Sequence, residues 1–301
     1  MAIDHESGSD DHDGPRLSRD LAAMDRIALG RRRALGLFGS VGATAFLAGC
    51  GGSGSSSSGS AVSTVTTTAT PSPAVTATAS TSSACVTYAF ETNGPYPADG
   101  TNTSRGISSN VLAESGAVRS DIRSSFLGSS AAAAEGIETT LTITLADVNN
   151  GCAALAGYAV YIWHCDVNGD YSLYDLPSES YLRGVQVSDA NGQVTFTTIW
   201  PGCYNGRFPH IHFEVYSALE NATSGRYALL ISQFAMPGEH NDDVYATSTY
   251  APSRANYSGE SIGSDNVFGD NTSAQQEAMT LVASGSVSKG YSAAATVGIA
   301  T

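Results

Sequence analysis

The chain has 301 residues, 42% of them hydrophobic and 14% charged, and an excess of acidic side chains gives it a formal charge of -14. A protein that neutralises nucleic-acid phosphates needs clustered lysine and arginine, whereas this chain has a single lysine, Lys289, so nucleic acid is excluded as a partner. The abundance of Ser, Thr, Ala and Gly favours a protein of strands and loops over a helical bundle.

The N-terminal region is predicted to be an export signal with an acidic extension. Polar residues 1–30 precede three arginines at 31–33 and an apolar run that ends at Cys50. The arginines resemble the twin-arginine signal of bacteria, and residues 47–50 (Leu-Ala-Gly-Cys) resemble a lipobox, in which the cysteine is acylated. An uncleaved anchor is the alternative. We expect residues 1–49 to be removed, and the remainder to be exported and held at the outer face of the cell membrane by a lipid on Cys50 alone.

A linker is predicted to follow the acylated cysteine. Residues 51–83 contain only Gly, Ser, Ala, Val, Thr and Pro, so this stretch has no aromatic or charged side chain with which to build a core. We therefore expect residues 50–84 to be a disordered tether and residues 85–301 to form one folded domain.

That domain is predicted to be all-β. Segments rich in β-branched and aromatic residues predict strands at 140–148, 158–164, 194–199, 208–216, 228–234 and 291–299. Asn-Gly pairs at 168–169, 191–192 and 205–206 favour turns with left-handed backbone. Weak helical patterns occur only at 111–115 and 275–282. Many short strands in this length favour an antiparallel β-sandwich core, or a barrel, with long loops and little helix.

Four cysteines remain if Cys50 is acylated, and an exported protein can oxidise them. Four cysteines allow three pairings, of which we expect Cys85 with Cys152 and Cys165 with Cys203. Metal binding is the alternative for these side chains, although no C-x-x-C spacing supports it.

A His-x-His pair is the first candidate site. Residues two apart on a strand point to the same face, so His210 and His212 would present their imidazoles side by side while Ile211 faces the other way. This arrangement suits two neighbouring ligands of one metal ion, although taken alone the pattern is better explained by a polar strand face.

Two tyrosines, Tyr171 and Tyr204, each follow directly on a turn or a strand end. A phenolate is a hard anionic donor, and a strongly charged cation such as Fe(III) lowers the pKa of a phenol enough to bind it at neutral pH. Without further information these side chains are better explained as half-buried tyrosines at strand ends.

Three segments resemble one family when they are taken together, in order. They are Trp163-His164 with Gly169-Asp170-Tyr171-Ser172, Pro201-Gly202-Cys203-Tyr204, and Arg207-Phe208-Pro209-His210-Ile211-His212-Phe213. The region from about residue 92 to about residue 236 resembles the intradiol ring-cleavage dioxygenases, which include catechol, hydroxyquinol and protocatechuate dioxygenases.

The resemblance implies one non-haem Fe(III) held by Tyr171, Tyr204, His210 and His212. It implies a reaction in which both atoms of O2 enter a catechol-type ring and a cis,cis-muconate-type diacid is released. Tyr204 would also act as a base toward the substrate. Arg207 and Gln233 would bind the substrate and stabilise charge that develops on its ring.

Further residues are interpreted beside that resemblance. Tyr96 would line the substrate pocket, with a plain turn as the alternative. His164 is expected to be a hydrogen-bonded interior histidine, and His240 an exposed loop residue. The thiols of Cys165 and Cys203 would tend to reduce Fe(III), so the resemblance favours a disulfide that clamps the two tyrosine segments.

The chain also departs from the family pattern. The gap between Tyr204 and His210 is short, which leaves the size of the substrate open, and the helical dimerisation region of the cytoplasmic enzymes is absent. A homodimer is nevertheless compatible with the sequence. The alternative functions are a non-catalytic cell-surface sandwich module for carbohydrate binding or adhesion, and a zinc or copper site that uses only the histidine pair.

Overall fold

The computed structural model describes residues 85–301. The predicted signal at 1–49, the predicted acylation site Cys50 and the predicted linker up to residue 84 lie outside the described residues. Among residues 85–301 no helix is both long enough and apolar enough to cross a membrane.

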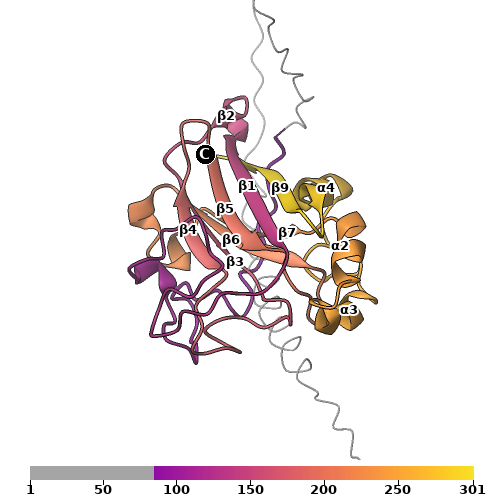
Figure 1. The fold of residues 1–301 in the computed structure, drawn as a ribbon. Helices are drawn as coiled ribbons and strands as arrows, with labels where there is room; N and C mark the ends of the chain where they lie inside the picture. The colour runs from indigo at the N-terminus through magenta and orange to yellow at the C-terminus, as the bar shows by residue number, and fades with distance from the viewer. Residues whose placement is uncertain (1–84) are drawn as a thin grey trace, which may run out of the picture.

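Within residues 85–301, nine strands form two sheets, as the predicted sandwich requires (Figure 1). The first sheet has the order β2-β1-β9-β8, and β5 pairs with β1 beside this path. Its strands are β1 (Glu138–Asp147), β2 (Ala153–Ala154), β5 (Gln193–Ile199), β8 (Val282–Ser286) and β9 (Gly290–Ile299). The second sheet has the order β4-β3-β6-β7. Its strands are β3 (Ala159–Trp163), β4 (Arg183–Val187), β6 (His210–Tyr216) and β7 (Leu230–Ala235).

The six predicted strands are all present, with ends shifted by at most a few residues. Three strands were not predicted, because β2 has two residues, β4 is short and β8 is rich in serine and glycine, so none of them shows a strong strand pattern. One pairing differs from the antiparallel expectation, since β9 runs parallel to β1 from Thr139 opposite Tyr291 to Asp147 opposite Ile299. The Asn-Gly turns are confirmed, because the glycine of each pair has a positive φ.

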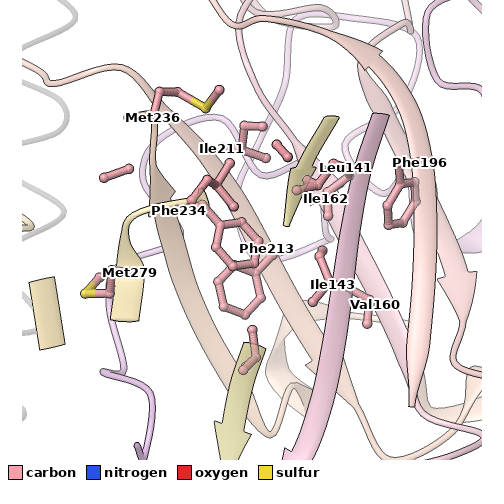
Figure 2. Close-up of a cluster of buried hydrophobic side chains, with 14 of the residues drawn as sticks. Leu141, Ile143, Val160, Ile162, Phe196, Ile211, Phe213, Phe234, Met236 and Met279 are labelled. Carbon is pink, nitrogen blue, oxygen red and sulfur yellow. The ribbon is translucent and has the colours of Figure 1, made fainter. Parts of the chain in front are cut away.

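The sheets share one hydrophobic core, shown in Figure 2. Leu141, Ile143 and Leu145 of β1 face it together and are fully buried, as their alternation predicts. The second sheet contributes alternate residues from its central strands, among them Ile211 and Phe213 of β6. The remaining residues of these strands must therefore point to the opposite face of the second sheet.

That opposite face is also buried, because loops cover it. Tyr161 and Trp163 of β3 pack there with Tyr96 and Tyr171, which come from loops before β1 and after β3. Every residue of β3 and β6 is buried as a result. The candidate site residues lie in this second layer, between the sheet and its loops.

In the described part of the chain, three short helices lie together beside the sheets (Figure 1): α2 (Gly238–Tyr245), α3 (Ala251–Tyr257) and α4 (Ser273–Met279). The pattern at 275–282 predicted part of α4, whose start is stabilised by a capping box between Thr272 and Gln275. The pattern at 111–115 corresponds to a 3-10 turn at Val111–Ala113. α2 was not predicted because it is polar on most of its surface, without the apolar period that marks a helix.

His240 lies in α2 and not in an exposed loop, so the expectation for this residue is wrong. Its Nε2 lies 3.1 Å from the carbonyl oxygen of Ala283, and the ring packs beside Trp200 and Tyr291. The helix turns this side chain toward the first sheet, where the local sequence indicated only a polar loop.

The Cys85–Cys152 disulfide is present, as expected. It joins the first described residue to the loop between β1 and β2 and closes a segment with a sequence separation of 67. Closing a loop of this length restricts the unfolded chain, which stabilises the fold by about 4 kcal/mol.

Replacing both Cys85 and Cys152 with serine should therefore lower the free energy of unfolding by about 4 kcal/mol, because the unfolded chain regains the entropy of that loop. Urea denaturation of the oxidised wild type and of the double variant measures the difference. A change below about 1 kcal/mol would show that the bridge contributes little to stability.

Candidate metal centre

The two histidines of β6 bring their ring nitrogens together. His210 and His212 both point away from the shared core, and their Nε2 atoms lie 3.1 Å apart. β6 lies between β3 and β7, so its backbone is paired along both edges and the two side chains start from a fixed base. Both residues are at most 2% exposed.

The hydrogen bonds of His210 leave its Nε2 with a lone pair. Nδ1 lies 2.6 Å from the carbonyl oxygen of Phe208, and because a carbonyl oxygen can only accept, Nδ1 carries the proton. Burial and the nearby charge of Arg207 lower the pKa of His210 to about 3, and burial and His210 lower the pKa of His212. Both imidazoles are therefore neutral at neutral pH, which is the state that binds a metal ion.

His212 is held in a different way. Its ring stacks on the indole of Trp163, with ring centroids 4.8 Å apart and planes within 7° of parallel. Among the described residues no hydrogen-bond partner reaches its buried Nδ1. Because metal-bound histidines usually donate their second nitrogen to a carbonyl or carboxylate, stacking replaces that restraint here.

Both predicted tyrosines reach the histidine pair. The hydroxyl of Tyr171 lies 3.4 Å from Nε2 of His210. The ring of Tyr204 lies edge-on to both Tyr171 and His210, with centroid distances of 5.8 and 5.7 Å. Tyr171 and Tyr204 are at most 1% exposed. Two phenols and two imidazoles thus converge in one buried place, although three separate segments supply them.

Glycines allow the two tyrosine segments to approach each other. Gly169 has a φ of +86°, and a Cβ atom there would lie 3.1 Å from Cβ of Tyr204. A Cβ atom on Gly202 would lie 2.0 Å from the carbonyl oxygen of Asp166, which no larger residue can avoid without moving the backbone. Gly169 and Gly202 therefore leave the space that lets the two tyrosine segments contact each other.

The donor set fits Fe(III). Among residues 85–301 no group of three or more His, Cys, Asp or Glu side chains is placed to hold one ion, and the set that converges here consists of two histidines and two tyrosines. Phenolates suit a strongly charged, hard cation, and imidazoles suit iron as well as zinc and copper.

Arg207 and Gln233, the two residues predicted to bind the substrate, contact each other in the structure. Nη2 of Arg207 donates to Oε1 of Gln233 at 2.6 Å, and Nε2 of Gln233 donates to the carbonyl oxygen of Thr92 at 3.0 Å. Nε of Arg207 also forms a buried ion pair with Asp265 at 2.9 Å. Sequence reasoning missed Asp265, because it lies 58 residues further along the chain, in a loop without a recognisable motif.

Two solved structures share this architecture. An intradiol ring-cleavage dioxygenase from Tetranychus urticae is 24% identical, with 72% of this chain and 95% of that chain covered and a TM-score of 0.52. A second dioxygenase has the same identity and coverage, with a TM-score of 0.53. The fold is that of the intradiol ring-cleavage dioxygenases. The resemblance predicted from sequence is thus confirmed at the level of the fold. No protein-family model matches the chain, and no curated protein matches it.

Within this intradiol dioxygenase fold, Tyr96 lies beside the candidate centre. Its ring stacks on that of Tyr171, with centroids 4.6 Å apart. The buried guanidinium of Arg183 on β4 ties the two segments together by donating to the carbonyl oxygens of Tyr96 and Ser172, each at 2.9 Å. Arg183 was not singled out from the sequence, since a lone arginine gives no sign of the loops it will join.

The expected bridge between Cys165 and Cys203 is absent, so this prediction is wrong. Both residues are buried and neither is in a disulfide. Sγ of Cys203 lies 3.4 Å from the carbonyl oxygen of Arg207, which means that this thiol is directed at its own loop. Close packing at Gly169 and Gly202 joins the tyrosine segments instead.

An open hollow of about 420 Å³ lies between α2 and α3. None of the predicted site residues lines it. Arg254, on its wall, donates to the carbonyl oxygens of Tyr245 and Ala246, which end α2. The hollow therefore belongs to the packing of these helices and is separate from the candidate centre.

His164 is a hydrogen-bonded interior residue, as predicted. Its Nδ1 donates to the carbonyl oxygen of Cys165 at 2.8 Å, so its Nε2 accepts from the hydroxyl of Thr198 at 2.7 Å. Burial is the main cause that lowers the pKa of His164 to about 4. The folded protein therefore takes up this proton only at a pH well below that at which the unfolded chain does so.

This difference predicts a loss of stability in acid. As the pH falls below about 6.5, the unfolded chain protonates the imidazole while folded His164 stays neutral, so the free energy of unfolding falls until the pH reaches about 4. Between pH 7 and pH 5 the wild type should lose about 2 kcal/mol more than His164→Gln, which has no such proton. Chemical denaturation at both values provides the comparison, and equal losses in the two proteins would contradict the assignment.

Proposed function

We propose that the protein is a member of the intradiol ring-cleavage dioxygenases that inserts both atoms of O2 into a catechol-type ring and releases a cis,cis-muconate-type diacid. The observation that carries the proposal is the convergence of His210, His212, Tyr171 and Tyr204 in one buried place. It occurs within the fold of these enzymes.

The same four residues would hold one non-haem Fe(III). When bound, Fe(III) would supply Lewis acidity that lowers the pKa of catechol hydroxyls and of the tyrosine phenols. His210 is prepared for this role because Phe208 keeps the proton on Nδ1 and leaves Nε2 open. The His212 ring is held by its stack on Trp163, which fixes the plane of the ring.

The surrounding residues would then bind and orient the substrate. The phenolate oxygen of Tyr204 would accept a proton from a catechol hydroxyl and become a neutral phenol. The guanidinium of Arg207 would donate hydrogen bonds to oxygen atoms on which negative charge develops. Tyr96 would form part of the pocket wall, because its ring lies against Tyr171. Because these groups are buried, bulk water would have little access to the reacting atoms.

We further propose that this activity lies outside the cytoplasm, on a protein anchored through an acylated Cys50. The arginines at 31–33 and the apolar run up to Cys50 support the proposal. Metabolic labelling with a fatty acid would test it, since Cys50→Ala should abolish incorporation and leave the domain at 85–301 intact.

Iron content and colour test the proposed centre directly. Phenolate bound to Fe(III) absorbs visible light, so the purified protein should contain one iron per chain, be coloured, and change its spectrum when catechol is added. Tyr204→Phe and His212→Ala should each abolish oxygen uptake with catechols, because each removes a proposed ligand. Oxygen consumption across a panel of substituted catechols measures the activity and identifies the preferred ring.

Matched controls are available for both variants. Tyr227→Phe changes a tyrosine that is 62% exposed, and His240→Gln changes a histidine of α2, so both should retain full activity and colour. A colourless protein that contains zinc would instead support a site built on the histidine pair alone. A protein without bound metal or oxygen uptake would support a binding module.

A further inference from the structure

Asp265 holds the guanidinium of Arg207 in a fully buried ion pair. Oδ2 of Asp265 lies 2.9 Å from Nε of Arg207, and Oδ1 lies 3.4 Å from Nη2. The two side chains are 0% and 1% exposed, respectively. The contact therefore fixes the guanidinium along one side. An ion pair on the surface would leave the guanidinium free to move.

The carboxylate is itself held by backbone amides. Oδ2 also accepts from the amide of Phe208 at 2.7 Å, and Oδ1 accepts from the amides of Val267 and Phe268 at 2.8 and 3.1 Å. Burial alone would raise the pKa of Asp265, but the charge of Arg207 and the hydrogen bonds from Arg207 and from the amide of Phe208 outweigh it and leave the pKa below its ordinary value. Asp265 is therefore a fixed, ionised acceptor.

Gln233 holds the guanidinium from a second direction. Its Oε1 accepts a hydrogen bond from Nη2 of Arg207 at 2.6 Å, and its Nε2 donates one to the carbonyl oxygen of Thr92. The oxygen end of the Gln233 amide therefore holds Arg207, while the nitrogen end is anchored to the backbone at Thr92. A planar guanidinium bound at Nε and at Nη2 cannot rotate, so its orientation toward the rings of the candidate centre is set.

Phe208 connects this pair to the histidines. The amide of Phe208 donates to Asp265, while the carbonyl oxygen of the same residue accepts from Nδ1 of His210. One carboxylate therefore restrains both the side chain of Arg207 and the backbone residue that orients His210.

We propose that Asp265 is the positioning residue for Arg207, and that Gln233 acts with it. The inference rests on the proposed function, in which Arg207 donates to oxygen atoms of the substrate. Because the charge of Arg207 is balanced by Asp265, the guanidinium acts as a directed hydrogen-bond donor and not as a free positive charge. Its contribution to the reaction then depends on its orientation, which Asp265 supplies.

Asp265→Asn should lower kcat for ring cleavage by about 100-fold with little change in KM, because a misplaced donor loses stabilisation that operates mainly in the transition state. The decisive comparison is made in an Arg207→Gln background, where adding Asp265→Asn should cause a much smaller loss than in the wild type, because only the contact through Phe208 to His210 remains to be disturbed. If the fold-loss of kcat in the double variant equals the product of the losses in the two single variants, Asp265 acts independently of Arg207 and the proposal is overturned.

A second readout does not depend on activity. In the protein without metal, the Nε–H resonance of Arg207 in a 15N spectrum should be sharp and protected from solvent exchange. Asp265→Asn should broaden it or speed its exchange at least tenfold. An unchanged resonance in Asp265→Asn would also overturn the proposal.

Asp265→Glu serves if the asparagine variant does not fold, since it keeps the charge and displaces the carboxylate. It should bind iron and show the visible band, yet have a reduced kcat; wild-type kcat would count against the proposal. Asp189→Asn is the matched control, because Asp189 also accepts hydrogen bonds from backbone amides, those of Asn191 and Gln193, but in an exposed turn.

If the wild type neither binds iron nor consumes oxygen, the proposed function fails. If the wild type is active and Asp265→Asn is equally active, only the inference about Asp265 fails.

Discussion

The alternation of side chains along β6 is the constraint on which the candidate centre depends. Ile211 and Phe213 face the core that the two sheets share, and His210 and His212 consequently face the loops. A slip of one residue in the pairing of β6 would exchange these sets and bury two imidazoles in an apolar core. Pairing with β3 on one edge and β7 on the other holds the register, and packing of Ile211 and Phe213 makes any slip costly.

The loop-covered face of the second sheet buries charged groups, which is stable only where each has partners. Arg207 has Asp265 and Gln233, and Arg183 has carbonyl oxygens and a serine hydroxyl. Such networks contribute less to stability than apolar residues of the same size would. They do give the loops defined positions, because each arginine joins segments that are far apart in the chain.

Much of the fold and part of the site could be predicted. The alternating strands and the Asn-Gly turns are local patterns, and His210 and His212 share one strand, so their common face follows from its period of two. Tyr171 and Tyr204 were linked to them only through the family resemblance, because nothing in either local sequence indicates a meeting. Among the cysteines, Cys85–Cys152 is confirmed and Cys165–Cys203 is wrong, as pairing depends on side-chain directions that spacing does not reveal.

By itself the sequence determined the six strands with a clear alternating pattern, their buried faces and the identity of residues able to bind a hard cation. These properties follow from the order of neighbouring residues. Only the tertiary structure decided which of those residues meet, and which others support them. Asp265 reaches Arg207 across 58 residues, and Arg183 reaches Tyr96 across 87. Contacts of this kind arise when loops pack on the sheet, and the periodicity of the local sequence does not predict them.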